Sequence, residues 1–244
     1  MDSGYYAACA GLRAQSQALE VAANNLANLT TGGYRAQRAT FQSLLAASSG
    51  GQTNNLNTAI NDFGVLGGTH TDLSPGSLER TGNPLDLGIE GQGFFAVETE
   101  RGVLYTRSGN FHVSPQGKLV DAQGAVVQGA QGAMAVPAGV VSISPDGTLS
   151  VSGAVAGRLR VIDFASGTLL QAEGDAYYSA PKGSGKPATQ SYIRQGMIEG
   201  SNVSPVGTVV DLIAVQRSAE MMQRVLSTFH SEFNRIAAGE LPRV

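Results

Sequence analysis

The sequence predicts a mixed α and β fold, in which helices near both ends form a coiled-coil domain and an all-β, sandwich or barrel-like domain is inserted between them. Three observations predict it. Apolar residues near both ends recur at alternating spacings of three and four, which is the heptad pattern. The middle holds short apolar runs about ten residues apart, separated by turns that contain glycine. The 244 residues include 32 Gly and 9 Pro, so the chain is long enough for a core and rich in turns.

The first predicted helix covers most of the N-terminal 30 residues and contains several alanines, which favour helix. We expect it to end at 30–33, Thr-Thr-Gly-Gly, because glycine readily takes the left-handed conformation that follows a helix. We call its apolar heptad positions the N-terminal seam, formed by Tyr5, Ala8, Leu12, Gln15, Leu19, Ala22, Leu26 and Leu29. Within it, the candidate assembly residues are Leu12, Leu19, Ala22, Leu26 and Leu29.

The next segments are expected to be irregular. Residues 34–41 read as an ordered connector, and 42–73 are rich in Ser, Gly, Asn and Thr with little periodicity. We therefore expect a long connecting loop over 42–73.

The predicted β domain covers 74–190, and residues 182–190 within it resemble a polar linker with three Gly or Pro positions. The turns 115–117, 121–124 and 145–147 have hairpin chemistry, because proline presets φ and glycine accepts positive φ. The candidate strands are 85–89, 94–97, 103–106, 110–113, 118–120, 140–143, 148–151 and 159–164.

A second helix follows, in a segment 191–244 that we assign with 1–41 to one discontinuous helical domain. Ser204 and Pro205 supply an N-cap and a first-turn proline, and Gly239 and Pro242 should end the helix. Such a helix is about 50 Å long at 1.5 Å per residue. We call its heptad positions the C-terminal seam, formed by Leu212, Val215, Ala219, Met222, Leu226, Phe229, Phe233 and Ile236.

The second helix has more apolar surface than one partner helix can cover. We call the excess the second stripe, formed by Val206, Val210, Ile213, Met221 and Val225. Two interpretations stay open: the stripe packs on other copies of the chain, or both apolar faces pack on the chain's own β domain. Contacts between copies that do not close a ring generate filaments or tubes, so the first interpretation predicts a polymer.

Composition excludes several partners. The formal net charge is −3 and no Lys/Arg cluster is present, so nucleic acid and anionic membranes are poor candidates. The single Cys9 is expected to be a small buried apolar residue. No run approaches the ~20 apolar residues of a membrane span. Because the first residues lack the basic and apolar regions of a secretory signal, these rules alone indicate the cytoplasm.

No catalytic, cofactor or metal site is predicted. His70, His112 and His230 have no ligand spacing. The 91–93 Gly-Gln-Gly triplet precedes a strand, so we expect a turn and not a phosphate loop.

Two competing functions remain. The carboxylates Asp86, Glu90, Glu98 and Glu100 could pair as acid and base in a glycan-cleaving enzyme, although on strands bordered by turns they are more often solvated. A secreted β-rich adhesin is the other alternative, but it leaves both heptad helices unexplained.

Three separate motifs resemble the bacterial flagellar rod, hook and hook-associated axial proteins. The first is the run from Asn24 to Asn28 followed by Thr31 and Gly33-Tyr34-Arg35. The second comprises 91–97, 105–111 and 117–120, and the third is 196–203 with the helix after it. The motif residues are Asn24, Asn25, Asn28, Gly33, Tyr34, Gly91, Gly93, Phe94, Phe95, Tyr105, Arg107, Gly109, Gly200, Asn202 and Val203.

The resemblance implies a structural subunit of the flagellar rod, most similar to the proximal-rod subunits by its length and its 146–148 turn, with the distal-rod subunits as the alternative. It implies export through the flagellar type III apparatus without a cleavable signal, which replaces the cytoplasmic expectation. It also implies that the paired terminal helices line an inner tube around the export channel. The implied partners are copies of this chain, other rod proteins and the export apparatus. No nucleic acid, small-molecule substrate or membrane insertion is expected.

The asparagines of the first motif are unusual within a helix, because asparagine is a poor helix former. Asn24, Asn25 and Asn28 either fix the register between helices or are simply exposed.

Overall fold

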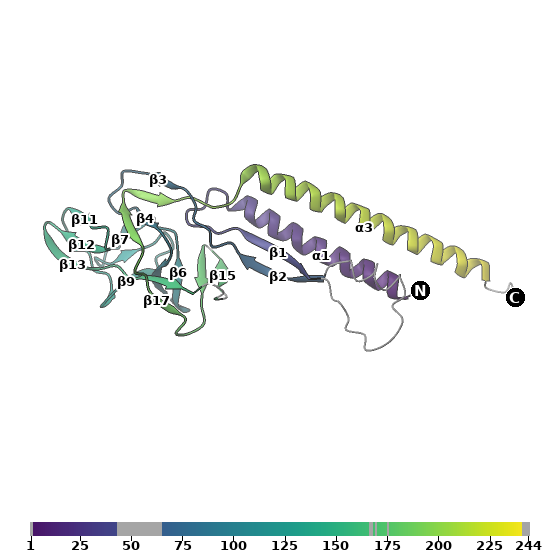
Figure 1. Cartoon of the computed structure of the whole chain (residues 1–244), viewed down its shortest axis with the longest axis horizontal. Helices are drawn as coiled ribbons and strands as arrows, with labels where there is room; N and C mark the ends of the chain where they lie inside the picture. Colours follow the sequence, from purple (N-terminus) through teal and green to yellow (C-terminus); the bar gives the residue numbers. More distant parts are fainter. Residues whose placement is uncertain (1, 43–64, 166–167, 169, 175, 241–244) are drawn as a thin grey trace. The chain divides into compact units, whose positions relative to one another are not determined.

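The computed structural model describes residues 2–42, 65–165, 168, 170–174 and 176–240 (Figure 1). The chain divides into two compact units. Unit 1 comprises residues 1–27, 37–70 and 204–244, and unit 2 comprises residues 28–36 and 71–203. Each unit is therefore built from segments that are distant in sequence.

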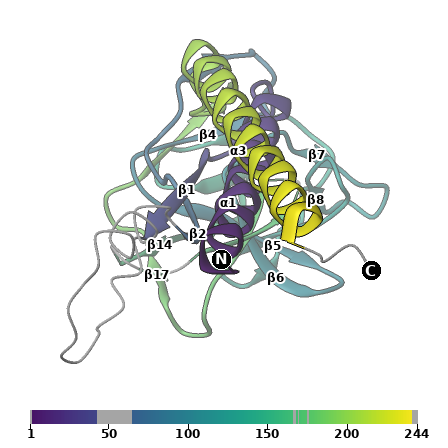
Figure 2. The same cartoon turned by 90° about the vertical axis from the view of Figure 1, so that its right-hand side faces the viewer.

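Unit 1 contains two long helices and one small sheet. Helix α1 (Asp2–Ala27) and helix α3 (Pro205–Glu240) pack along each other, and the small sheet pairs β1 (Gln37–Gln42) with β2 (Val65–Thr71). The start of α1 and the end of α3 lie at the same end of the pair, so the helices are antiparallel (Figure 1). Helix α1 also contacts β1, and Figure 2 shows α1 between α3 and that strand.

The predicted helix caps are confirmed at the start of α3. The Gly207 amide donates to Ser204 Oγ at 3.3 Å and the Thr208 amide to the Ser204 carbonyl at 2.9 Å, which is the arrangement of an N-cap serine before a first-turn proline. Helix α1 ends at Ala27, close to the predicted stop, and Gly33 has the positive φ of 71° expected there. Among the described residues, neither helix combines the length and apolar character that crossing a bilayer demands.

The prediction of one long loop over 42–73 is wrong at both of its ends, where β1 finishes at Gln42 and β2 covers 65–71. Residues 43–64 lie outside the described residues. The sequence of β2, Val-Leu-Gly-Gly-Thr-His-Thr, lacks the apolar alternation of a half-buried strand, and its glycine pair favours a turn. Pairing with β1, not local pattern, determines this strand.

Unit 2 consists of short antiparallel strands, which confirms the mixed α and β class. Every predicted strand run overlaps a strand of the structure. The strands are β3 (Leu78–Arg80), β4 (Leu87–Glu90), β5 (Phe94–Thr99), β6 (Gly102–Thr106), β7 (His112–Val113), β8 (Leu119–Val120), β9 (Val126–Gly129), β10 (Gly132–Ala133), β11 (Val141–Ile143), β12 (Thr148–Val151), β13 (Ala154–Arg158), β14 (Val161–Phe164), β15 (Gln171–Gly174), β16 (Tyr177–Ser179), β17 (Gly185–Pro187), β18 (Tyr192–Gln195) and β19 (Met197–Glu199).

The largest sheet has ten strands, with the order β15-β16-β6-β5-β9-β8-β7, while β10 joins β9 and β14 bridges β5 and β17. The strands β11-β12-β13 form a separate sheet, and the pairs β18-β4 and β19-β3 form two more. The predicted turns at 115–117, 121–124 and 145–147 connect β7 to β8, β8 to β9 and β11 to β12, with positive φ at Gly117, Gly124 and Gly147.

Two predicted boundaries change. The predicted 182–190 linker contains β17, which pairs with β14. The segment 192–199, which sequence pattern assigns to the helical domain, instead forms β18 and β19, which pair with β4 and β3. Because these late strands complete sheets begun by early strands, unit 2 extends to Val203.

Strand β5 organises the core of unit 2, because both of its faces are buried. Phe95 and Val97 belong to the main cluster with residues such as Leu119 and Leu149, whereas Phe94 and Ala96 belong to a second cluster with Ile162, Phe164 and Tyr178. A strand covered on both faces is continuously apolar rather than alternating, which explains the run Phe-Phe-Ala-Val. The ring of Phe95 meets Phe111 edge-on, with centroids 5.1 Å apart.

Candidate functional site

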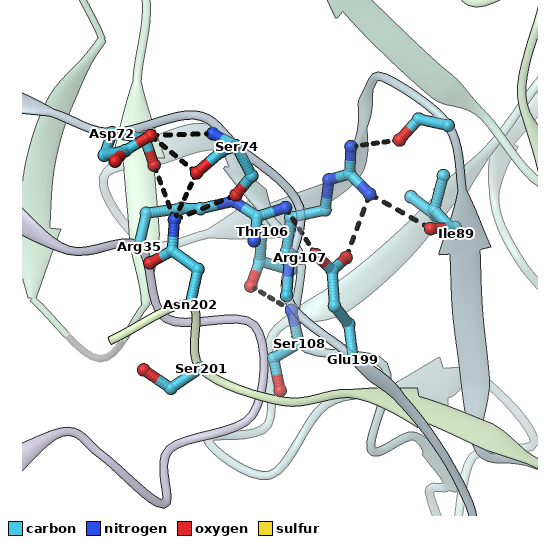
Figure 3. A network of polar contacts seen from close by, with 12 residues as sticks. Arg35, Asp72, Ser74, Ile89, Thr106, Arg107, Ser108, Glu199, Ser201 and Asn202 are labelled. Carbon is cyan, nitrogen blue, oxygen red and sulfur yellow. Dashed lines mark hydrogen bonds and ion pairs between the residues drawn. The ribbon is translucent and has the colours of Figure 1, made fainter. Parts of the chain in front are cut away.

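Three motifs that are distant in sequence meet within unit 2 at the carboxylate of Glu199. Arg35 Nη2 donates to Glu199 Oε1 at 2.5 Å and Arg107 Nη1 donates to Glu199 Oε2 at 2.9 Å (Figure 3). The Gly76 amide donates to Oε1 at 2.8 Å. The three charged side chains are at most 3% exposed. Each carboxylate oxygen therefore has a charged partner, away from water.

Backbone contacts position the cluster. Glu199 is the last residue of β19, and its carbonyl accepts the Gly33 amide at 2.7 Å. The Arg35 amide donates to the Tyr178 hydroxyl at 3.0 Å. The Arg107 guanidinium also donates to the carbonyls of Ile89 and Gly91, at 3.1 and 2.6 Å. The glycine turn at 91–93 therefore supplies a carbonyl that holds an arginine.

Glycine is required at position 33 by close packing. A Cβ on Gly33 would lie 2.2 Å from the amide nitrogen of Ser108 and 2.3 Å from the carbonyl carbon of Arg107. The segment 28–36 thus lies directly against the backbone after β6, and only a residue without a side chain allows this contact.

The cluster holds two positive charges and one negative charge. Desolvation lowers the pKa of Arg107 to about 10, while the nearby carboxylate of Glu199 opposes this shift, so Arg107 stays charged at neutral pH. The Arg107 guanidinium also lies over the ring of Phe94, 5.3 Å from its centroid, a favourable cation–π contact. Among the described residues, Arg35 Nε and Nη1 and Arg107 Nε have no hydrogen-bond partner. An ion cluster that is buried and bonded in this way holds segments together and offers no accessible acid or base.

A second polar contact joins three of the four chain ends of unit 2, those near Ala36, Asp72 and Asn202. Asn202 Oδ1 accepts the Ala36 amide at 2.6 Å, and Asn202 Nδ2 donates to the carbonyls of Asp72 and Ser74 at 2.9 and 2.8 Å (Figure 3). The Asp72 amide donates to the Ala36 carbonyl at 2.8 Å. The Asn202 amide side chain therefore binds the backbone at Ala36 and at residues 72–74.

The asparagines of the first motif have distinct roles. Asn25 is buried on α1, where its Nδ2 donates to the Gln37 carbonyl at 2.7 Å and its Oδ1 accepts the Gln37 amide at 2.8 Å. Asn25 therefore binds both backbone polar groups of Gln37, the first residue of β1, and holds this residue against the helix. Asn28 Oδ1 accepts Thr31 Oγ1 at 3.0 Å after the helix ends, and Asn24 is exposed.

The most buried line of α1 differs from the predicted seam. It consists of small residues and Asn25, namely Gly11, Ala14, Ala18, Ala22 and Asn25. The predicted residues Leu12, Leu19, Leu26 and Leu29 are half-buried beside it, and only Ala22 belongs to both. Small side chains let neighbouring backbones approach closely, and the alanines of this line are more deeply buried than the leucines beside it.

The C-terminal seam and the second stripe differ in exposure. The seam residues Leu212, Val215, Ala219, Met222 and Leu226 are half-buried. The side chains of Phe229, Phe233 and Ile236 lie outside the described side chains. All five residues of the second stripe are exposed. Their exposed fractions are 76% for Val206, 59% for Val210, 45% for Ile213, 60% for Met221 and 43% for Val225. Glu220 and Arg224 form an ion pair on the exposed surface of α3, at 3.7 Å.

The remaining motif residues belong to the structure of unit 2. Buried positions are Gly33, Tyr34, Gly93, Phe94, Phe95, Arg107, Gly109 and Val203, whereas Tyr105 and Gly200 are half-buried and Gly91 is exposed. Gly109 carries the closest approach of all, because a Cβ there would lie 1.7 Å from the Leu87 carbonyl oxygen.

Three of the candidate acid and base residues each bind a different partner. Glu90 pairs with Arg194 at 2.6 Å in solvent, Glu98 accepts Gln128 Nε2 at 2.7 Å, and Asp86 accepts Asn83 Nδ2 at 3.0 Å. His70, His112 and His230 are exposed on separate elements. In the part of the chain that the structure describes, no group of three or more His, Cys, Asp or Glu side chains is placed to hold a metal ion. The half-buried Cys9 lies on α1.

Sequence reasoning did not identify Glu199 and Arg35 as site residues, although both lie within quoted motifs. The available signal was a charged residue at the end of a short apolar run, Met197-Ile198-Glu199. That signal indicates a buried charge but not its partner.

Comparison with protein families gives three matches in the expected order. Residues 6–35 match the family described as flagella basal body rod protein, 88–151 match the flagellar hook protein FlgE/F/G D1 domain, and 194–237 match the flagellar basal body rod FlgEFG protein C-terminal region. The three matched segments contain Arg35, Arg107 and Glu199 respectively, so the ion cluster joins one residue from each.

Full-length relatives agree with these matches. The chain is 34% identical to the flagellar basal-body rod protein FlgG of Agrobacterium fabrum, covering 91% of this chain and 93% of the relative. It is 34% identical to the rod protein FlgF of Salmonella typhimurium, covering 93% and 94%, and 29% identical to FlgF of Caulobacter vibrioides, covering 100% of both.

Proposed function

The chain belongs to the flagellar basal-body rod protein family, and on that premise we propose that it acts in the basal body as a structural rod subunit that polymerises through the exposed face of α3. The observation that carries this proposal is the second stripe, five apolar side chains exposed along one helix. Burying an exposed Val, Ile or Met side chain completely stabilises by about 1.5–3 kcal/mol. Neighbouring subunits are the partners that would supply this burial.

The antiparallel pair of α1 and α3 is the proposed polymerisation domain, a coiled coil that lines an inner tube, and the inserted β strands form the domain outside it. The half-buried C-terminal seam and the exposed second stripe support this division of roles. With two apolar faces, α3 could contact several neighbours along different directions, as a shaft that transmits torque requires. Copies of this chain and other rod proteins are the proposed neighbours, and the subunit catalyses no reaction.

The decisive experiment replaces Val210 and Ile213 together with serine. The matched control replaces Val140 and Val155, exposed valines of unit 2, with serine. We expect the α3 variant to remain folded in dilute solution but to be missing from isolated basal bodies, while the control is incorporated. Incorporation of both variants to the same extent would refute the role of the α3 face.

Position along the rod and route of export are further parts of the proposal. We assign the chain to the proximal rod from its length and its 146–148 turn, with the distal rod as the alternative, and imaging of labelled subunits in basal bodies distinguishes the two. Export is proposed to use the flagellar type III apparatus. Disabling that apparatus should leave the chain in the cytoplasm, and normal export from such cells would contradict this route.

A further inference from the structure

Arg217 interrupts the second stripe of α3. It lies four residues after Ile213 and four residues before Met221, and residues four apart are neighbours on one face of a helix. Its side chain is exposed, as are the side chains of Ile213 and Met221. A positive charge therefore lies within the apolar surface that we propose neighbouring subunits cover.

Among the described residues of the chain, the Arg217 guanidinium has no ion-pair or hydrogen-bond partner. Arg224 differs, because it pairs with Glu220 at 3.7 Å on the same helix. In the free chain, water stabilises the Arg217 charge. Covering the second stripe would remove that water, and a charge buried without a partner is strongly unfavourable. The proposed contact therefore requires a negative group on the surface that covers the stripe.

Helix α1 carries a face that meets this requirement. At 3.6 residues per turn, this face lies opposite the most buried line of the helix. We call it the exposed face of α1, formed by Arg13, Ser16, Glu20, Ala23, Asn24 and Ala27. Glu20 is the one acidic residue of α1 whose side chain the structure describes, and within the described part of the chain it has no ion-pair partner. Arg13 is two helical turns from Glu20, about 10 Å along the axis.

The two faces also complement each other in size. The second stripe consists of Val, Ile and Met side chains, whereas Ser16, Ala23 and Ala27 around Glu20 are small. Large side chains interdigitate well with small ones across a helix contact. Each face therefore offers what the other lacks, and the central charges of the two faces, on Arg217 and Glu20, are opposite.

We propose that the second stripe of one subunit packs on the exposed face of α1 of a second copy of this chain, with Arg217 paired to the Glu20 carboxylate of that copy. The inference rests on the proposed role of the second stripe in polymerisation and names the surface that covers it. Apolar contact is non-directional and allows the helices to slide. The ion pair fixes the register, because any shift that separates the two charges buries both without partners.

Charge reversal in the full chain tests the pair. Sedimentation at high concentration measures assembly, and circular dichroism of the dilute chain checks that each variant is folded. Arg217→Glu and Glu20→Arg should each raise the concentration needed for assembly by about tenfold or more, because each places like charges together. The double variant restores an opposite pair and should assemble within about threefold of wild type. The control Lys182→Glu reverses an exposed charge of unit 2 and should assemble as wild type does.

Arg217→Leu separates the ion pair from simple apolar contact. The substitution makes the second stripe continuous, so assembly would strengthen if apolar burial alone governed the contact. We expect weaker assembly, because Glu20 of the second copy is then buried without a partner. Stronger assembly of Arg217→Leu would overturn the inference, and so would a double charge-reversal variant that assembles no better than the single variants.

Asp211 is a competing carboxylate, exposed on α3 itself. Rescue of Arg217→Glu by Asp211→Arg and not by Glu20→Arg would mean that the second copy docks through α3, and the inference would be wrong. Incorporation of the variants into isolated basal bodies should follow the same order as sedimentation. If the wild-type chain neither sediments as a polymer nor enters basal bodies, the proposed rod function fails. If wild type assembles and both single charge reversals assemble equally well, only this inference fails.

Discussion

Arg35 and Glu199 form a buried ion pair at 2.5 Å although 164 residues separate them in the sequence. Arg107 completes the cluster from a third segment, at 2.9 Å from the other carboxylate oxygen. Each of the three family matches contributes one of these residues. The cluster therefore joins the three matched segments to one another in the folded chain.

Replacing Glu199 with glutamine should strongly destabilise unit 2. The substitution keeps the shape of the side chain but removes the charge that compensates two buried guanidinium groups. Breaking a buried ion pair on one side typically costs about 3–5 kcal/mol. Urea unfolding of the full chain should show a loss of that size. The control Glu79→Gln, on the exposed side of the neighbouring strand β3, should change stability by less than about 0.5 kcal/mol.

Replacing Gly33 with alanine should destabilise the chain by more than about 4 kcal/mol, because the new Cβ cannot fit against the 107–108 backbone. The control separates this clash from backbone strain. Gly124 also has positive φ, 86°, but has open space around it, so Gly124→Ala should cost only the left-handed strain of about 1–2 kcal/mol. Equal losses of thermal stability in the two variants would contradict the role of close packing at Gly33.

Tyr178 should make the stability of the chain fall at alkaline pH. Burial raises its pKa to about 12 from the usual 10.0, and the bond from the Arg35 amide opposes this only in part. Tyrosine in the unfolded chain therefore loses its proton first, so its contribution is complete below pH 10 and is lost as the pH rises towards 12.

Urea unfolding at a series of alkaline pH values checks this dependence. Tyr178→Phe should be less stable at neutral pH, because the Arg35 amide loses its acceptor, but its stability should decline less steeply above pH 10. Burial also raises the pKa of Tyr34, so part of the slope should remain. A slope unaffected by the substitution would rule out Tyr178 as its source.

Replacing Asn25 with alanine should detach the start of β1 from α1. Loss of the two hydrogen bonds to Gln37 is expected to cost about 1–3 kcal/mol, offset by up to about 0.7 kcal/mol of improved helix propensity. Asn24→Ala, at an exposed neighbouring position, gains the same propensity and is the matched control. Faster amide exchange at Gln37 in Asn25→Ala alone is the expected result, and protection at Gln37 in both variants would contradict it.

Local sequence pattern predicted those parts of the fold that depend on interactions between residues close in sequence. The helices near both ends showed 3.6-residue periodicity with caps such as Ser204, and β5 showed a continuous apolar run. The strands that pattern missed are mostly polar or exposed. All four residues of β15 are exposed, and β17 is Gly-Lys-Pro. Such strands form because a partner strand is available, and the partner is not visible in the local sequence.

In the candidate site, too, local pattern identified some residues but not the contacts between them. Family motifs marked Gly33, Arg107 and Asn202, but their chemistry became clear only when the fold brought 33–36, 72–76, 107 and 199–202 together. Pattern alone chose the leucines of α1 as its assembly residues. In the structure the most buried apolar side chains of this helix are the small ones of Ala14, Ala18 and Ala22.

Adjacent residues on α3 distinguish pairing of the helices from assembly of subunits. Leu226 is half-buried, so Leu226→Ala should cost roughly 1–2 kcal/mol, less than the 2–5 kcal/mol of a fully buried leucine. Val225 is 43% exposed, so Val225→Ala should leave the dilute chain within about 0.5 kcal/mol of wild type. In assembly Val225→Ala should have the larger effect of the two substitutions, because the proposed contact with neighbouring subunits uses the face of α3 that carries Val225. Urea unfolding at low concentration and sedimentation at high concentration measure the two effects separately. If Val225→Ala weakened the dilute chain as much as Leu226→Ala, the second stripe would be part of the subunit's own core and could not be the surface that neighbouring subunits cover.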